Sequence, residues 1–410
     1  MKTYILSFFL FSCSLLFGQE WESVNSGTDL RLNSISFASS SIGYIGGNDS
    51  LLLKTTNGGD TWLPQATTGV IFNFGLKDII QVDFLDEDIG FLTVGTVDYG
   101  GNLYKTIDGG LNWQVEDTWM CAPIKTYNFD ENTAIAIGSG CFTGKDIDKK
   151  ENGEWGSIYR TLSWANDYLF AIDFYNEDYG MVAGDGGIVY RTFNGGLDWD
   201  TVETFTNHTF RDLKFVNDSM IYGVVDSLQN SFLISVDSGA TWAEHNASLT
   251  FFYPHFEALA LTSFNEIMAV GNTNLGNNGF LLWGNEDAVF WNYETVDYAL
   301  HDVTVSDDSV AFAVGDSGLI VRNTQMYLGV EETEPPMNIS FYPNPVNDVL
   351  TIENDFEEIQ QVHIYDLNGR RVLSQGDQFH QLSLSYLKPG IYFLEVIGEN
   401  DRAQYKLIKQ

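Results

Sequence analysis

The sequence has few basic residues: 20 Lys and Arg against 56 Asp and Glu in 410 residues, a net charge of −36. Such a chain repels a nucleic-acid backbone or an anionic membrane surface, so neither is expected as a partner. The six histidines show no zinc-ligand spacing. The acidic segment 146–154 has Lys150 and Glu151 where an EF-hand loop needs Asp or Asn and then Gly. We therefore expect no metal site and no cofactor, and the sequence points to no catalytic residues.

Long apolar runs are missing after the first eighteen residues. Lys2, an apolar run over 4–17 and Gly18 have the order of a secretory signal peptide, which we place at residues 1–18. No later stretch reaches the roughly 20 apolar residues of a spanning helix, so we expect export without membrane insertion. Cysteine is also scarce, and cleavage after residue 18 would leave only Cys121 and Cys141 in an oxidising compartment.

The sequence does contain a repeated turn motif. Four segments share the pattern Ser/Thr-x-Asp/Asn-x-Gly-x-Thr/Asn/Asp-Trp, and their glycines are separated by 51, 86 and 43 residues. Because 86 is twice 43, one repeat in the middle has lost its box. The pattern residues are Thr55, Asn57, Gly59 and Trp62; Thr106, Asp108, Gly110 and Trp113; Thr192, Asn194, Gly196 and Trp199; and Ser235, Asp237, Gly239 and Trp242.

A second repeat places strands around these boxes. Seven short apolar runs that mostly end in Gly, such as 91–95 and 311–315, follow one another at steps of 42 to 49 residues, and each is preceded by an alternating segment. Four-stranded propeller blades are about 40–45 residues long. The spacing predicts an all-β chain with a seven-bladed β-propeller over residues 19–328. The seventh repeat lacks a final strand, which Trp21 to Val24 should supply.

The two remaining cysteines lie on either side of the first hairpin of the third repeat. Its turn is expected at 130–132, and Cys121 and Cys141 are equidistant from residue 131. Residues equidistant from a hairpin turn face each other, at a separation close to that of a disulfide. We therefore predict a Cys121–Cys141 disulfide.

The boxes resemble the Asp-box, also called the bacterial neuraminidase repeat, and their tandem arrangement resembles the propellers of the photosystem II assembly-factor and sortilin type. The resemblance covers roughly residues 21–325 and implies the propeller fold. In such a box the Asp or Asn oxygen accepts backbone N–H bonds within the turn, Gly adopts a left-handed conformation and Trp packs beneath. The box residues are therefore expected to be structural rather than catalytic.

After an acidic, proline-containing linker over 329–337, the composition changes. Tyr-Pro-Asn-Pro at 342–345, Asp-Leu-Asn-Gly-Arg at 366–370, Leu-Lys-Pro-Gly-Ile-Tyr at 387–392 and Lys-Leu-Ile-Lys at 406–409 occur among alternating strand segments. The pattern predicts a small antiparallel β-sandwich over 338–410. This segment is similar to the C-terminal sorting domain of the Bacteroidetes type IX secretion system. The resemblance implies the type IX machinery as a partner and a secreted or cell-surface location.

Two classes of function remain open. The first is a non-enzymatic binding or scaffold propeller, monomeric, with a protein or glycan ligand at one propeller face. The second is a sialidase-like or other glycoside hydrolase, because Asp-boxes occur in such enzymes. A sialidase-like site needs three arginines around the substrate carboxylate. The propeller has only Arg31, Arg160, Arg191, Arg211 and Arg322, and no Arg-Ile-Pro segment, which favours the binding protein.

Overall fold

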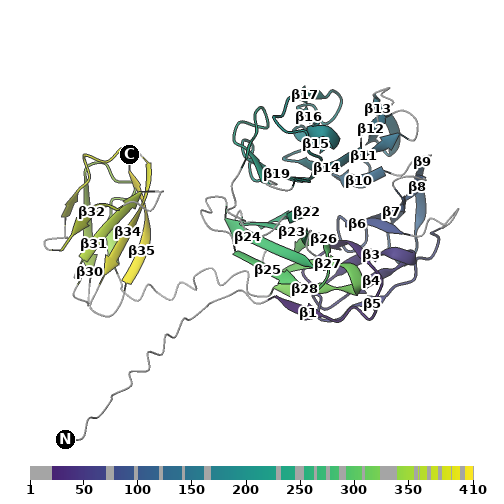
Figure 1. Ribbon diagram of the computed structural model, residues 1–410, viewed down its shortest axis with the longest axis horizontal. Coiled ribbons are helices and arrows are strands. Elements are labelled where there is room, and N and C mark those ends of the chain that lie inside the picture. The colour runs from purple at the N-terminus through teal and green to yellow at the C-terminus, as the bar shows by residue number, and fades with distance from the viewer. Residues whose placement is uncertain are drawn as a thin grey trace, which may run out of the picture. The chain divides into compact units, whose positions relative to one another are not determined.

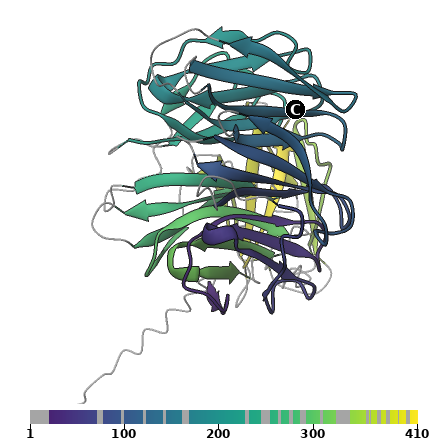
Figure 2. The same ribbon diagram turned by 90° about the vertical axis from the view of Figure 1, so that its right-hand side faces the viewer.

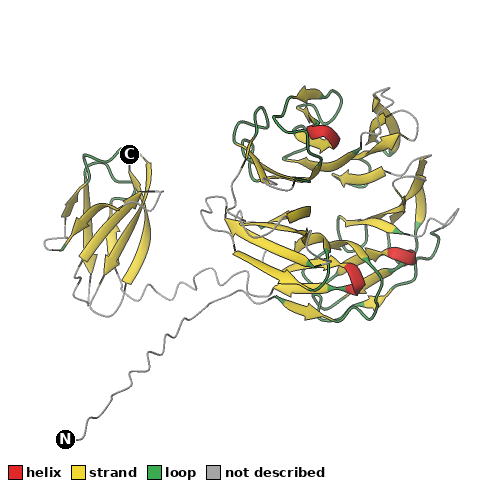
Figure 3. Cartoon of the chain, in the orientation of Figure 1, coloured by secondary structure: helices red, strands yellow, loops and turns green. Residues whose placement is uncertain are grey.

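The computed structural model is built almost entirely from β-strands, with three short 3-10 turns as its helical elements in the described ranges (Figure 3). It describes residues 21–70, 78–96, 100–119, 123–140, 144–160, 168–227, 232–244, 254–262, 266–273, 278–285, 292–306, 310–323, 339–354, 359, 361–366, 371–376, 381–388, 390–397 and 402–409. These divide into two compact units, which separate between Met326 and Tyr327. None of the described helical turns is long and apolar enough to cross a membrane.

Seven four-stranded antiparallel sheets make up the first unit (Figure 1). Sheets 1 to 3, innermost strand first, are β2 (Leu32–Phe37), β3 (Gly43–Gly47), β4 (Leu52–Thr55) and β5 (Leu63–Pro64); β6 (Ile79–Phe84), β7 (Gly90–Thr96), β8 (Gly100–Thr106) and β9 (Gln114–Trp119); and β10 (Pro123–Asn128), β11 (Ala134–Gly140), β12 (Gly144–Glu151) and β13 (Glu154–Arg160).

Sheets 4 to 7 repeat this order. They are β14 (Leu169–Phe174), β15 (Gly180–Gly184), β16 (Val189–Thr192) and β17 (Asp200–Val202); β18 (Phe210–Phe215), β19 (Ile221–Val225), β20 (Phe232–Ser235) and β21 (Ala243–Glu244); β22 (Pro254–Leu261), β23 (Glu266–Thr273), β24 (Gly279–Asn285) and β25 (Asn292–Val296); and β26 (Leu300–Ser306), β27 (Val310–Gly315), β28 (Ile320–Asn323) and β1 (Glu22–Val24). The 3-10 turns η1 (Asn48–Ser50), η2 (Asp185–Gly187) and η3 (Asp316–Gly318) follow β3, β15 and β27.

The innermost strands close a cycle, because each contacts the innermost strand of the next sheet and β26 returns to β2. The sheets pack around this cycle (Figure 2), and the buried side chains between them come from adjacent sheets, as in the cluster of Tyr44, Ile79, Leu92 and Trp113. The ring therefore has two faces. We call the face where the innermost strands begin the upper face, and the opposite face, which carries the Asp-box turns, the box face.

The predicted seam is confirmed. Strand β1 pairs antiparallel with β28, with Glu22 opposite Arg322 and Val24 opposite Ile320 (Figure 1). Each outermost strand of the box-containing sheets begins one residue after the box Trp rather than at it, and β1 likewise begins after Trp21. The Trp ring turns into the core at this point, since Trp21 is buried and lies 6.1 Å from Trp283 of sheet 6.

The predicted Cys121–Cys141 disulfide assumes one constant strand register along the hairpin, and the register shifts between Pro123 and Lys125. Cys121 and Cys141 lie outside the described residues. Between them, Asn128 pairs with Ala134 and Lys125 with Ile137, which centres the turn on residue 131 as predicted. A bulge between Pro123 and Lys125 then shifts the pairing by one residue, so that Pro123 faces Gly138. Equal distance from the turn is therefore the wrong criterion at the cysteine end, and the disulfide stays a prediction.

The second unit is the predicted β-sandwich. One sheet contains β29 (Ile339–Tyr342), β30 (Val349–Asn354) and β33 (Gln381–Ser383), and the other contains β32 (Arg371–Gln375), β31 (Gln361–Asp366), β34 (Gly390–Ile397) and β35 (Arg402–Lys409). Both sheets contribute to one buried cluster that includes Leu350, Ile364, Leu394 and Leu407. This unit therefore has a core of its own.

Candidate functional site

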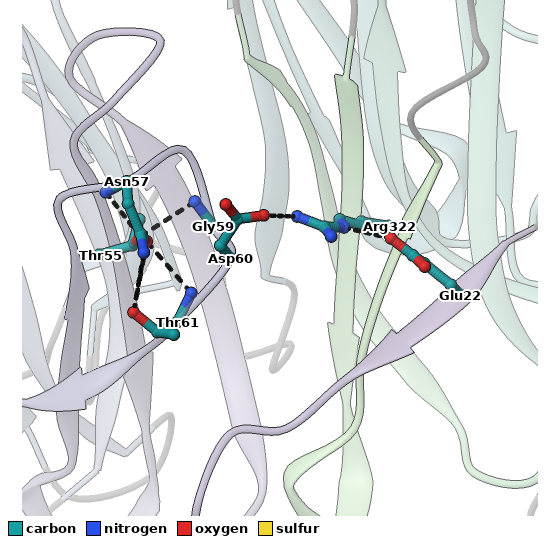
Figure 4. Close-up of polar contacts among 7 residues, drawn as sticks. All are labelled: Glu22, Thr55, Asn57, Gly59, Asp60, Thr61 and Arg322. Atoms are coloured by element: carbon teal, nitrogen blue, oxygen red, sulfur yellow. Dashed lines mark hydrogen bonds and ion pairs between the residues drawn. The ribbon is translucent and has the colours of Figure 1, made fainter.

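The Asp-box side chains satisfy their own turns. In the first box, Thr55 Oγ1 accepts the backbone N–H of Gly59 at 2.9 Å, and Asn57 Oδ1 accepts that of Thr61 at 3.1 Å (Figure 4). The other three boxes repeat both bonds at 2.8 to 3.0 Å, and in each bond a side-chain oxygen accepts a backbone N–H four residues later. The acceptors and donors are Thr106 with Gly110 and Asp108 with Asn112; Thr192 with Gly196 and Asn194 with Asp198; and Ser235 with Gly239 and Asp237 with Thr241. These oxygens are occupied by the turn.

The carboxyl groups at the third box position, Asp108 and Asp237, have lowered pKa values. Hydrogen bonds from Asn112 lower the pKa of Asp108, and hydrogen bonds from Thr241 lower that of Asp237. A carboxyl group with a depressed pKa is a poor proton donor. The box acids are therefore unsuited to act as the general acid of a glycosidase.

The box glycine and tryptophan lie at the boundary between sheets. Gly59 has φ of +86°, and a Cβ added there would lie 2.4 Å from the Phe312 ring of sheet 7. Trp62 is buried and meets Phe37 edge to face, with ring centroids 5.9 Å apart. The other box tryptophans, Trp113, Trp199 and Trp242, are buried as well. The box therefore contributes buried side-chain contacts as well as a turn.

Sheet 3 replaces the lost box with a two-residue turn. Asn152 and Gly153 connect β12 to β13 with φ of 52° and 85°, the left-handed pair of a type I′ hairpin. Lys150 stands where the other boxes have Ser or Thr; it is almost fully buried, forms an ion pair with Glu116 of sheet 2 and donates to the carbonyl of Glu131 at 2.7 Å. The Asn-Gly dipeptide is the sequence signal that could have located this turn.

A basic residue before the box joins one sheet to the next, which is the structural role that the position of Arg191 just before a box indicates in the sequence. Lys54 donates to the carbonyl of Gly109 at 3.0 Å, and Arg191 donates to that of Ser238 at 2.7 Å, so each reaches the same position of the following box. Arg322 contacts Asp60 of the first box and Glu22 of β1 at once (Figure 4). Two of the five propeller arginines are therefore engaged on the box face, and Arg160 ends the outermost strand β13.

Carboxylates on the innermost strands bond to the next sheet. Asp302 accepts the backbone N–H of Ile35 at 2.9 Å, Asp173 that of Phe215 at 2.8 Å and Asp212 that of Leu259 at 2.9 Å. Lys125 pairs with Asp212 at 2.7 Å, and Asn128 donates to Asp83 at 2.7 Å. All four carboxylates have partners, which assigns them to holding the ring together.

A β-bulge at the start of every innermost strand turns one extra residue toward the upper face. Register shifts fall between Phe210 and Asp212, between Phe256 and Ala258 and between Leu300 and Asp302, so the skipped residues are Arg211, Glu257 and His301. Bulges re-aim side chains and occur next to functional sites. Adjacent polar residues that interrupt the alternation, as in Arg211-Asp212, are the sequence signal for it.

These bulged residues belong to what we call the upper-face cluster, which consists of Arg31, Arg211, Asp226, His255, Glu257, His301 and Asp316. Asp226 follows β19 and contacts Arg211 at 3.1 Å and His255 at 2.6 Å. Asp316 follows β27 and contacts His301 at 2.9 Å and Arg31 at 3.8 Å. Each aspartate thus links a bulged residue of its own sheet to a residue at the start of the next sheet: His255 is the second residue of β22, and Arg31 directly precedes β2.

Glu257 is the bulged residue of sheet 6, between the two aspartate groups in chain order. Burial raises its pKa, although the charges of Arg211 and Arg31 act in the opposite direction. Burial and the charge of Arg31 lower the pKa of His301, against its hydrogen bond to Asp316. Arg31 Nη2 lies 3.3 Å from His301 Nδ1, and because a guanidinium only donates, Nδ1 accepts and the proton of the neutral ring is on Nε2.

The cluster keeps hydrogen-bonding capacity for a ligand. The Arg31 side chain is 49% exposed and that of Arg211 32%, and each guanidinium has five N–H donors. Arg211 also lies over the Phe170 ring, 5.2 Å from its centroid. The described residues hold no group of three or more His, Cys, Asp or Glu arranged for a metal ion.

The fold is that of a β-propeller followed by a secretion sorting domain. Residues 340–410 match the family of secretion system C-terminal sorting domains, which indicates export by type IX secretion to the cell surface or the medium. No curated protein matches the chain in sequence.

Solved structures similar to this chain are propellers. YCF48 from Cyanidioschyzon merolae is 17% identical with a TM-score of 0.58, and the match covers 75% of this chain and 99% of that one. A structure of YCF48 bound to D1 peptide is 18% identical, with a TM-score of 0.58 and coverage of 74% and 96%. The WD40 propeller domain of Doa1 is 12% identical, with a TM-score of 0.55 and coverage of 74% and 95%. These similarities show the fold.

Proposed function

We propose that the protein is a non-enzymatic binding module of the cell surface or medium, and that its ligand binds at the upper-face cluster. The observation that carries this proposal is the pairing of two half-exposed arginines, each anchored by an aspartate, around the half-buried carboxyl of Glu257. Anchored arginines present fixed donors, and Glu257 supplies an acceptor. Ligands with both donors and acceptors, namely a peptide backbone or sugar hydroxyls, match this combination.

Two further observations support binding over catalysis. The box oxygens and the four carboxylates of the innermost strands are bonded within the ring. On the box face, Arg191 donates to the carbonyl of Ser238 and Arg322 pairs with Asp60, so these two arginines are used within the protein. This does not favour a sialidase-like site, which needs three arginines around the substrate carboxylate, on that face. A peptide is the ligand in one fold neighbour, YCF48 bound to D1 peptide, which makes a peptide a reasonable first probe.

A glycoside hydrolase is the second candidate, and one observation favours it. Glu257 has a raised pKa and lies near Asp226, whose carboxylate contacts Arg211 and His255. Two neighbouring carboxyl groups, one with a raised pKa, are the kind of pair that glycosidases use. Turnover that disappears in Glu257→Gln would establish this second function.

The proposal predicts that binding is lost when the arginines are removed. Wild-type protein and the double variant Arg31→Ala/Arg211→Ala are applied to peptide and glycan arrays, and affinities for the retained spots are then measured. Hydrogen bonds to charged groups contribute about 1.5–3 kcal/mol each, so we expect affinity to fall at least about tenfold per arginine.

The control for this experiment is Lys105→Ala, which removes a basic side chain that pairs with Glu131 on the box face. It should bind as the wild type does. Equal binding by the double variant and the wild type, with both melting at the same temperature, would exclude the upper-face cluster as the site.

A further inference from the structure

Sheet 4 carries exposed aromatic side chains on the box face. Tyr175 is 47% exposed and Phe193 is 54% exposed. Tyr179 lies between them, stacked on Phe193 with ring centroids 4.8 Å apart and 6.4 Å from Tyr175. Tyr179 is itself buried, so the exposed rings of Tyr175 and Phe193 are joined through a buried ring. We call these two exposed rings the aromatic surface.

The turns themselves do not require aromatic residues at positions 175 and 193. The turn bond from the N–H of Tyr175 to the carbonyl of Tyr179 recurs in the other sheets from Ala38 to Ile42, from Leu85 to Ile89 and from Val216 to Met220. The second box position, occupied here by Phe193, holds Thr56, Ile107 and Val236 elsewhere. Phe129 is at the place of Tyr175 in sheet 3, and both Tyr175 and Tyr179 pack against Phe215 of sheet 5. Because small and aliphatic side chains close the same turns elsewhere, the exposed parts of Tyr175 and Phe193 are not needed for turn closure.

Acidic residues surround the aromatic surface. Glu177 and Asp178 are exposed in the turn between Tyr175 and Tyr179. Asp218 and Asp237 of sheet 5 lie close enough for their charges to raise the pKa of Tyr179, which burial raises most, to about 12. The nearby cation is Arg191, whose guanidinium lies 4.8 Å from the Phe193 centroid and donates to the carbonyl of Ser238. Thus a guanidinium already packs against this ring within the protein.

We propose that the aromatic surface is a second binding site, and that it binds a lysine- or arginine-rich segment of a partner protein. Cations bind the faces of Tyr and Phe rings, and the four surrounding carboxylates complement a basic chain. Tyrosine and arginine are also the residues that contribute most at protein interfaces. This site is on the opposite face from the upper-face cluster and does not depend on it.

The test uses the full-length mature protein and a fluorescein-labelled oligolysine peptide, with binding measured by anisotropy at low and high salt. The double variant Tyr175→Ala/Phe193→Thr installs the residues that sheet 1 has at the same positions. Ile107→Thr, the same box position in sheet 2, is the matched control. We expect the double variant to lose about tenfold in affinity, and the control to bind as the wild type does.

A second variant, Glu177→Gln, leaves the rings intact and should weaken binding and reduce its salt dependence. If the double variant unfolds, Glu177→Gln still tests the proposal. Equal loss in Ile107→Thr would mean that oligolysine binds the acidic box face at large, and would overturn the proposal. Absence of oligolysine binding by the wild type would overturn it as well. So would a result in which the double variant loses only glycan binding or self-association.

Discussion

Removal of residues 21–24 is expected to lower the melting temperature of the propeller by about 10 °C. Strand β1 is the outermost strand of sheet 7, and without it β28 becomes an exposed sheet edge. The deletion also takes away the buried Trp21 and the Glu22 partner of Arg322. Loss of a buried Trp costs about 3–5 kcal/mol, and each kcal/mol corresponds to about 2 °C in a domain of this size.

Thermal unfolding followed by circular dichroism measures this effect. The matched control is a chain that begins at Trp21, which shortens the terminus but keeps the strand. Trp21→Ala should give an intermediate melting temperature, because the backbone pairing with β28 remains. If the chain that begins at Asn25 melts with the wild type, β1 does not secure the ring.

Deletion of residues 338–410 is expected to abolish export while the propeller stays folded. The matched sorting domain lies in this segment, and the sandwich has its own buried cluster, so its removal takes no side chain from the propeller core. In a bacterium with a type IX secretion system, the truncated chain should accumulate inside the cell envelope. Immunoblots of envelope and medium fractions measure it.

The control for the export experiment is Gln381→Ala, an exposed substitution in the sorting unit that lies outside the motifs quoted above and leaves the core unchanged. It should reach the surface or medium like the wild type. Truncated protein in the medium at the wild-type level would show that export does not depend on this unit.

The repeat pattern was sufficient to predict the propeller and its seam, because both depend on local signals. Alternating segments and Gly-ended runs mark the strands, and the unpaired Trp21-to-Val24 segment marks the closing strand. The boxes combine a turn with a buried Trp, and such local features can be predicted from the sequence without knowledge of tertiary contacts. The turn of sheet 3 does not follow the box pattern, because Lys150 is at the place of the box Ser or Thr, and so the pattern does not predict it.

The candidate site could not be predicted in the same way. Arg31 and Asp316 are far apart in the sequence and meet because the ring closes. Arg211, Glu257 and His301 reach the upper face through bulges, whose position depends on the pairing with the neighbouring strand. The same kind of bulge shifts the strand register between Pro123 and Lys125, so equal distance from the turn no longer predicts which residues face each other towards Cys121 and Cys141.

The measurement that most directly tests whether this propeller binds rather than cleaves is a panel of chromogenic glycosides incubated with the mature wild-type protein. We predict no release of chromophore above the buffer blank from acidic to neutral pH, together with unchanged ligand retention in the control variant Lys105→Ala. Release of chromophore by the wild type and by Lys105→Ala, but not by Glu257→Gln, would contradict a non-enzymatic function and make Glu257 a catalytic acid.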